Sequence, residues 1–165
     1  MWSKILLSLP DVDSILEVGA NIGLNLDVLE VLSHARLIGL EPNDKARAEI
    51  KFRSINGSGE KIPLEDSSIE MVFTCGVLIH IPPVNLKKVC DEIYRVSSKY
   101  IVCIEYFSDK MEIVNYRGKK DLLWKRDFGK YWSDNYSLSL VDYGFFWKEA
   151  TGLDNLTYFI FEKKY

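Results

Sequence analysis

Hydrophobic residues along the chain alternate between short runs rich in Val, Ile and Phe and longer segments whose apolar positions recur with a helical spacing. The short runs predict strands at residues 14–18, 36–40, 53–55, 69–75, 100–104, 139–146 and 156–162. The longer segments predict helices at residues 24–32, 44–51 and 84–96. Strands that alternate with helices are typical of an α/β protein.

Residues that favour helix starts stand at the borders of these segments. Asn43 is placed to cap the second helix, with Asp44 in its first turn, and Pro82-Pro83 opens the third. Residues 108–136 are polar and aromatic, and we expect them to be partly helical.

The order of the elements also predicts how the strands pair. A helix between two strands implies a parallel crossover, whereas the turn at 151–155 is too short for one and implies an antiparallel pair. We therefore expect a three-layer, Rossmann-like α/β fold. Its seven-stranded sheet is mostly parallel, with the last strand antiparallel.

Composition and charge narrow the class of protein. The chain has 165 residues, 47% of them hydrophobic, which suits a single domain over residues 1–165 and excludes a disordered chain. It carries 21 Lys and Arg against 24 Asp and Glu, a formal charge of −3. Proteins that coat nucleic acids carry a basic excess, so we expect no nucleic-acid partner.

The remaining compositional features concern compartment and metals. Three cysteines lie in apolar runs and read as buried thiols of a reducing compartment: Cys75, Cys90 and Cys103. The apolar stretch before Pro10 is too short for a signal peptide or a membrane span. From these two features we expect a cytoplasmic protein with no membrane partner. With only His34 and His80 and no closely spaced Cys pair, we expect no metal site.

Candidate chemistry follows from the expected sheet, because ligands of open α/β sheets bind outside the carboxyl ends of the strands. The residues at those ends are 19–23, Glu41, Cys75-Gly76 with nearby His80, and Glu105-Tyr106.

The first of these loops reads Glu17-Val-Gly19-Ala-Asn21-Ile-Gly23. Its glycines allow a tight turn and close approach of a ligand to the main chain. A dinucleotide site would need G-x-G-x-x-G, which Asn21 and Leu24 do not provide. The acidic residue two positions before the first glycine suits a cationic ligand, while the alternative is an ordinary strand-to-helix turn. Glu41 is placed to accept hydrogen bonds from ribose hydroxyls, or is a solvated strand-end carboxylate.

These residues resemble the class I S-adenosylmethionine-dependent methyltransferases, whose signature is an acidic residue followed by G-x-G-x-G. The resemblance covers about residues 14–105, with Asn21 in place of the middle glycine. It includes the stretch 56–64, similar to the family's adenine loop, and the stretch 69–81, similar to its fourth strand. It implies S-adenosylmethionine as cofactor, bound by Glu17, Gly19, Asn21, Gly23, Glu41, Gly57, Ser58 and Cys75.

A narrower resemblance lies downstream. Residues 116–118, 121–128 and 141–145 are similar to the methylases associated with pseudaminic acid biosynthesis. That resemblance implies a sugar-type acceptor in a surface-polysaccharide pathway.

Residues 108–137 are interpreted as a substrate-cap insertion. Arg117 or Arg126 would hold a carboxylate or phosphate, and Tyr106, Tyr116 or Trp124 would cover the acceptor. The alternative for 116–128 is a solvated amphipathic helix.

A hydroxyl or amine acceptor must also lose a proton. His80 is the first candidate base and Glu105 the second, by their positions after the fourth and fifth strands. Alternatively, His80 packs on Pro82 as an ordinary loop residue.

Taken together, the sequence predicts a metal-independent methyltransferase acting on a small, anionic, sugar-type molecule. Two alternatives remain open: a non-catalytic protein of the same fold that binds cofactor or a partner enzyme, and an NAD-type oxidoreductase. The oligomeric state is left open.

Overall fold

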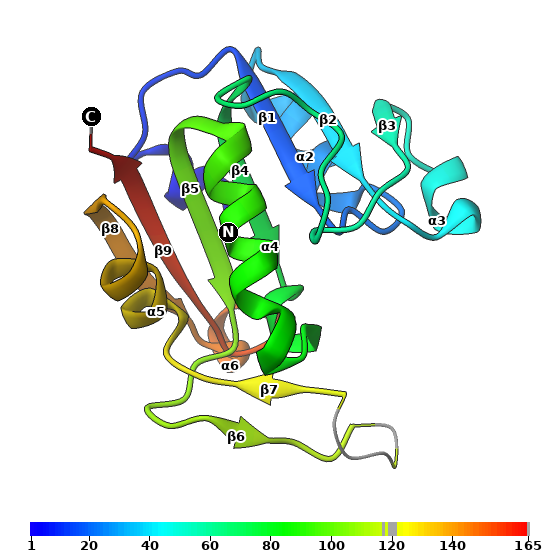
Figure 1. The fold of residues 1–165 in the computed structure, drawn as a ribbon. Coiled ribbons are helices and arrows are strands. Elements are labelled where there is room, and N and C mark those ends of the chain that lie inside the picture. The colour runs from blue at the N-terminus through cyan, green and yellow to red at the C-terminus, as the bar shows by residue number, and fades with distance from the viewer. Residues whose placement is uncertain (117, 119–121, 165) are drawn as a thin grey trace.

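The computed structural model describes residues 1–116, 118 and 122–164. Its main sheet has seven strands in the order β3-β2-β1-β4-β5-β9-β8. Their bounds are β1 (Ser14–Val18), β2 (Arg36–Leu40), β3 (Arg53–Ile55), β4 (Ile69–Cys75), β5 (Ser97–Glu105), β8 (Leu138–Phe146) and β9 (Leu156–Lys163). β9 runs antiparallel to both β5 and β8, whereas β1 to β5 are mutually parallel. The predicted fold class and the antiparallel last strand are confirmed (Figure 1).

The helices lie on both faces of this sheet. They are α1 (Trp2–Leu6), α2 (Leu24–Leu32), α3 (Asp44–Ala48), the 3₁₀ turn η1 (Leu78–His80), α4 (Pro83–Val96), α5 (Phe128–Asn135) and α6 (Lys148–Thr151). α4 and α5 cover one face and α1 and α2 the other (Figure 1).

Side chains that alternate in direction along the central strands explain why both faces of the sheet are apolar. In β4, Val72 packs with the α4 side chains, and its neighbours Met71 and Phe73 pack with α1 and α2. All three are buried. Because successive strand residues point to opposite faces, one strand contributes to both apolar layers.

Local side-chain chemistry sets where two of the predicted helices begin. Asn43 caps α3 through its Oδ1, which accepts from the amides of Lys45 and Ala46. The helix ends at Ala48 rather than at residue 51, because Ile50 is buried against the core and draws the chain into β3. Pro83 is the first residue of α4, as its fixed φ favours.

The segment after β5 is partly helical, as predicted, and its helix is α5. The alternative of an amphipathic helix over residues 116–128 does not apply, because among the described residues there Phe128 alone is helical, as the first residue of α5. A two-stranded ribbon, β6 (Glu112–Ile113) with β7 (Trp124–Lys125), is followed by α5. Ile113 faces Trp124 across the ribbon, and buried Leu123 anchors it to the core. The ribbon lies at the end of the molecule toward which β5 points (Figure 1).

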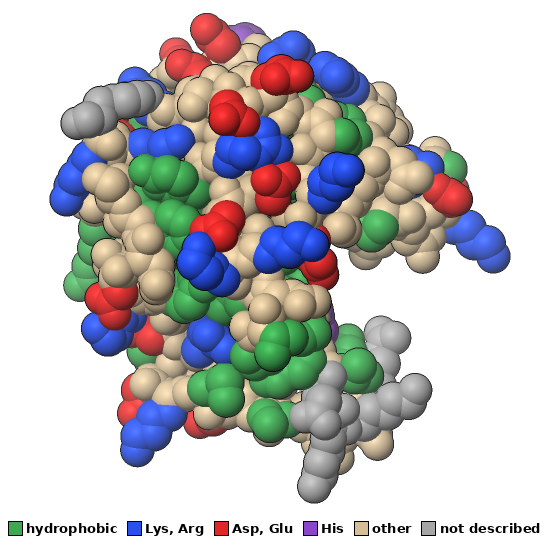
Figure 2. Space-filling view, viewed as in Figure 1, with side chains coloured by type: hydrophobic (Ala, Val, Ile, Leu, Met, Phe, Trp, Pro, Cys, Tyr) green, Lys and Arg blue, Asp and Glu red, His purple; other side chains and the backbone are tan. Residues whose placement is uncertain are grey.

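The surface is hollowed between the part that carries β2 and β3 and the part that carries this ribbon (Figure 2). The carboxyl ends of β1 and β4 lead toward this hollow (Figure 1). Within the described ranges, no helix has the length and apolar character needed to cross a membrane.

Candidate active site

The loop after β1 is held in a left-handed conformation at three alternate positions. The φ angles are 76° at Gly19, 49° at Asn21 and 86° at Gly23. Asn is the residue other than Gly that adopts this region most readily, which explains why it can replace a glycine here. The amides of Gly19 and Ala20 donate to the carbonyl of Leu40 at 2.8 and 3.0 Å, so the loop is fixed to the end of β2.

Glu41 joins this loop to the start of α3. Its Oε2 accepts from the amide of Asn21 and its Oε1 from the amide of Asn43, both at 2.8 Å. The side chain is 9% exposed. The carboxylate therefore stands beside the glycine loop, where the sequence predicted it.

Glu17 lies beneath the same loop and is almost fully buried. Its Oε1 accepts from the side-chain amide of Asn25 at 2.7 Å. Its Oε2 is buried and has no hydrogen-bond partner among the described residues. Burial, opposed by the Asn25 hydrogen bond and reinforced by the charge of Glu41, raises the pKa of Glu17 to about 8. The unsatisfied oxygen gives this buried carboxyl group a position for a cationic donor, whose positive charge would favour its ionised form.

These residues line a cavity of about 150 Å³, the glycine-loop pocket. Its lining is Glu17, Gly19, Ala20, Asn21, Ile22, Leu24, Asn25 and Cys75. Four of the predicted cofactor residues are in this lining: Glu17, Gly19, Asn21 and Cys75. Glu41 lies next to the pocket through Asn21. Gly23 starts α2, where it packs close to Ile50.

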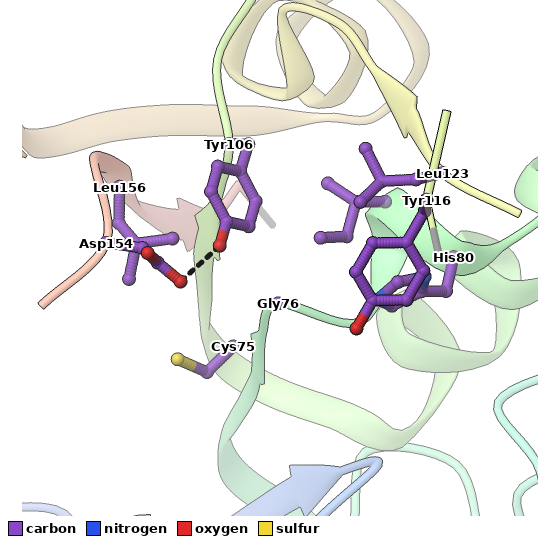
Figure 3. A pocket seen from close by; sticks show the side chains of 9 residues that line it. Cys75, Gly76, His80, Tyr106, Tyr116, Leu123, Asp154 and Leu156 are labelled. Carbon is purple, nitrogen blue, oxygen red and sulfur yellow. Dashed lines mark hydrogen bonds between the residues drawn. The ribbon is translucent and has the colours of Figure 1, made fainter. Parts of the chain in front are cut away.

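A second cavity of about 250 Å³, the tyrosine pocket, lies at the carboxyl ends of β4 and β5 (Figure 3). Its lining is Cys75, Gly76, Ile79, His80, Tyr106, Tyr116, Leu123, Asp154 and Leu156. Cys75 lines both cavities. Burial and the charges of Glu105 and Glu17 raise the pKa of its thiol to about 12. Cys75 is therefore a neutral wall between the cavities rather than a nucleophile.

Two polar groups face each other in the tyrosine pocket. The hydroxyl of Tyr106 donates to Oδ2 of Asp154, which comes from the connection between α6 and β9 (Figure 3). Burial and this bond raise the pKa of Tyr106, so its phenol is neutral at physiological pH.

His80 stands on the opposite wall, with its ring centroid 5.4 Å from that of Tyr116 (Figure 3). Its Nδ1 lies 2.8 Å from the carbonyl oxygen of Leu122. A carbonyl can only accept, so Nδ1 carries the proton. Nε2 of the neutral ring is then left with its lone pair.

Glu105 has a different position from the one expected of a base. Its carboxylate accepts from the amides of Val77, Leu78 and Ile79 at 3.1, 3.0 and 3.4 Å, and it does not line the tyrosine pocket. Burial, offset by these amides, raises its pKa to about 7. The carboxylate fixes the turn that presents His80, and its action as a base stays a prediction.

The predicted adenine loop begins beside Glu41, whose amide donates to the carbonyl of Ile55 at 3.1 Å. Gly57 follows, and a Cβ there would lie 2.9 Å from Leu40. Ser58 pairs with Lys61 in an isolated bridge. Neither residue lines the glycine-loop pocket, and their contact with adenine stays a prediction.

Only some of the predicted substrate residues line a cavity at the site. Tyr106 and Tyr116 line the tyrosine pocket, but Trp124 and Arg126 do not. Trp124 is buried in the ribbon. The Arg126 guanidinium stacks near Phe128 and Tyr131, at 6.0 and 5.8 Å from their ring centroids, and so is held against α5.

Arg117, the other predicted anion-binding residue, lies outside the described residues. Among those described, no group of three or more His, Cys, Asp and Glu side chains is placed to hold a metal ion.

Two residues of these cavities were missed from sequence. Asn25 sits in the first turn of α2 and carries no motif of its own, although its place two residues after Gly23 puts it beside Glu17. Asp154 lies in a turn that looked like a simple connection, and nothing local ties it to Tyr106, which is 48 positions away.

The chain is similar to known methyltransferases in sequence family and in fold. A methyltransferase domain family matches residues 16–103. No curated protein matches the chain. Among solved structures, a SAM-dependent methyltransferase from Methanosarcina mazei superposes with a TM-score of 0.78 at 14% identity, covering 99% of this chain and 98% of that one.

A 1,6-didemethyltoxoflavin-N1-methyltransferase from Burkholderia thailandensis, solved with bound 1,6-didemethyltoxoflavin and S-adenosylhomocysteine, gives a TM-score of 0.79 at 11% identity. The match covers 99% of this chain and 76% of that one. The PH0226 protein from Pyrococcus horikoshii gives a TM-score of 0.79 at 12% identity. That match covers 99% of this chain and 87% of that one. At these identities the likeness shows the fold.

Proposed function

Because the chain belongs to the methyltransferase domain family and S-adenosylmethionine is its cofactor, we propose that it methylates a small polar acceptor held in the tyrosine pocket. The observation that carries this proposal is the junction at Cys75. The glycine-loop pocket and the tyrosine pocket meet at this residue, so a donor in one lies next to an acceptor in the other.

The residues of the glycine-loop pocket fit the cofactor. The unsatisfied Oε2 of Glu17 would hold its ammonium group, and the carboxylate of Glu41 would hold its ribose hydroxyls. The left-handed loop leaves main chain rather than side chains facing the ligand at Gly19. When bound, S-adenosylmethionine supplies an activated methyl group on a sulfonium.

The protein's own contribution is alignment, exclusion of water and removal of the acceptor's proton. Nε2 of His80 is available to take a proton. Asp154 and Tyr106 form a hydrogen-bonding pair on the opposite wall, able to orient an acceptor hydroxyl or amine. The apolar side chains of Ile79, Leu123 and Leu156 complete the lining.

The shape and chemistry of the site support a sugar-type acceptor. Two tyrosine rings line the tyrosine pocket. The ring of a tyrosine can pack on the apolar face of a small molecule while its hydroxyl bonds to a polar group. Beyond the Tyr106–Asp154 pair lies a further cavity of about 430 Å³, the lysine pocket, lined in part by Lys125 and Lys148. We propose that it receives the anionic part of the acceptor. Assignment to a surface-polysaccharide pathway rests on the sequence resemblance.

Asp154→Asn is the direct test of the acceptor side. It keeps the shape of the side chain but weakens the acceptor of the Tyr106 hydrogen bond, so methyl transfer to nucleotide-sugar pools should fall about 100-fold. The affinity for S-adenosylmethionine, measured by calorimetry, should stay within about twofold because Asp154 does not line the glycine-loop pocket.

Asp134→Asn is the matched control, since Asp134 is paired with Lys130 on the exposed side of α5. Equal loss of transfer in both variants would contradict the proposal. A wild-type protein that binds the cofactor but transfers no label would instead indicate a non-catalytic binder.

A further inference from the structure

A chain of three side chains connects the N-terminal helix α1 to the glycine-loop pocket. The indole Nε1 of Trp2 donates to Oδ1 of Asn25 at 3.0 Å. Nδ2 of Asn25 donates in turn to Oε1 of Glu17 at 2.7 Å. The chain ends on the buried Oε2 of Glu17, which has no hydrogen-bond partner among the described residues.

We propose that Trp2 is a positioning residue for the cofactor: it fixes the Asn25 amide so that Glu17 keeps one oxygen free for the ammonium group of S-adenosylmethionine. The inference rests on the cofactor and not on the identity of the acceptor.

The chemistry of the amide explains why a donor is needed at this position. The side chain of Asn25 can present either its carbonyl or its NH₂ to Glu17, because the two ends have nearly the same shape. An indole N–H can only donate, so it can pair only with the carbonyl end. The NH₂ end is thereby directed toward the carboxylate. Reversed, Asn25 would place its carbonyl oxygen against Glu17 and repel the charged form.

Packing holds Trp2 in this orientation. The side chain is 2% exposed, and its ring meets that of Phe73 edge-on, with centroids 4.6 Å apart. Ile5, one turn later in α1, is buried in the same apolar layer. The first helix therefore connects core packing to the hydrogen bonding of the pocket.

The charge state of Glu17 is the quantity that this arrangement controls. From α2, the Asn25 hydrogen bond favours the carboxylate, whereas from the end of β2 the charge of Glu41 opposes it. Cys75, facing from β4, stays a neutral thiol at physiological pH. Loss of the Asn25 bond should therefore raise the pKa of Glu17 further and leave less carboxylate to bind a cation.

Trp2→Phe tests the inference, because it removes the N–H and keeps an aromatic ring against Phe73. In the free protein, the carboxyl titration of Glu17, followed by ¹³C NMR, should move upward by about 0.5–1 pH unit. At pH 6.5 the dissociation constant for S-adenosylmethionine should rise about three- to tenfold. Asn25→Ala should change both quantities in the same direction and at least as far.

Trp132→Phe is the matched control. It also removes a buried indole N–H, but one that lies in α5, outside the hydrogen-bonded chain from Trp2 to Glu17. It should leave both measurements unchanged. The inference is overturned if Trp2→Phe lowers thermal stability yet leaves the Glu17 titration and cofactor affinity as in wild type. It is also overturned if the double variant with Asn25→Ala shows fully additive losses. Because the titration is read on the free protein, its result is independent of methyl transfer.

Discussion

Replacing Glu17 with Gln should stabilise the free protein at neutral pH while weakening its affinity for S-adenosylmethionine at least 100-fold. The two effects have one origin. Glu17 is buried with one oxygen unsatisfied, which is unfavourable for a carboxylate in the free protein and favourable once a cation occupies the pocket. Gln keeps the shape and the acceptor for Asn25 but cannot carry the charge.

The pH dependence of this stability difference follows from the raised pKa of Glu17. Because the pKa of Glu17 in the folded protein is about 8, against 4.5 ordinarily, the folded state binds the extra proton between these values. Its contribution to the free energy of unfolding is fully present below pH 4.5 and is lost as the pH rises through 8. The stability advantage of the Glu17→Gln variant should therefore grow by about 3–4 kcal/mol from pH 5 to pH 8.

Thermal unfolding across this range measures the effect, and calorimetry measures the affinity. Glu30→Gln, an exposed change on α2, is the control and should alter neither. Glu105, whose pKa is also raised, is present in every variant and cancels from the comparison. A Glu17→Gln variant that binds the cofactor normally, or whose stability difference does not change with pH, would contradict the assignment of Glu17.

Replacing Glu41 with Ala should also abolish micromolar cofactor binding, but with the opposite effect on stability. The change removes the acceptor for two main-chain amides, those of Asn21 and Asn43, and leaves both without their partner. The loss of two charge-assisted bonds should lower the free energy of unfolding by about 2–4 kcal/mol. It also removes the group proposed to hold the ribose, so the dissociation constant should rise at least 100-fold.

Denaturant unfolding and calorimetry separate these effects. Glu49→Ala is the control, since Glu49 is exposed just after α3 and should leave binding unchanged. A Glu41→Ala variant that is destabilised but binds S-adenosylmethionine with wild-type affinity would show that Glu41 only fixes the loop. Opposite stability changes in the Glu17 and Glu41 variants, with a shared loss of binding, are specific to this account.

The sheet and the glycine loop were predictable because their information is local. The helix at residues 24–32 follows from its own apolar spacing, and the cap at Asn43 follows from the side chain's chemistry. The loop from Gly19 to Gly23 needs left-handed backbone, and Gly and Asn are the residues that provide it.

What could not be predicted depends on contacts between distant parts of the chain. Asp154 meets Tyr106 only because β9 is inserted beside β5 in the folded sheet. Glu105 ends its strand as expected, but three amides of the turn after β4 engage it. The ribbon of β6 and β7 forms in place of the alternative amphipathic helix, with Leu123 packed in the core.

The most direct test of the central claim is a crystal structure of the complex with S-adenosylhomocysteine. We expect its ammonium group within hydrogen-bond distance of Oε2 of Glu17, and its ribose hydroxyls on the carboxylate of Glu41. Its sulfur should face the tyrosine pocket past Cys75. A nucleoside bound elsewhere, or a glycine-loop pocket left empty at saturating ligand, would contradict the account.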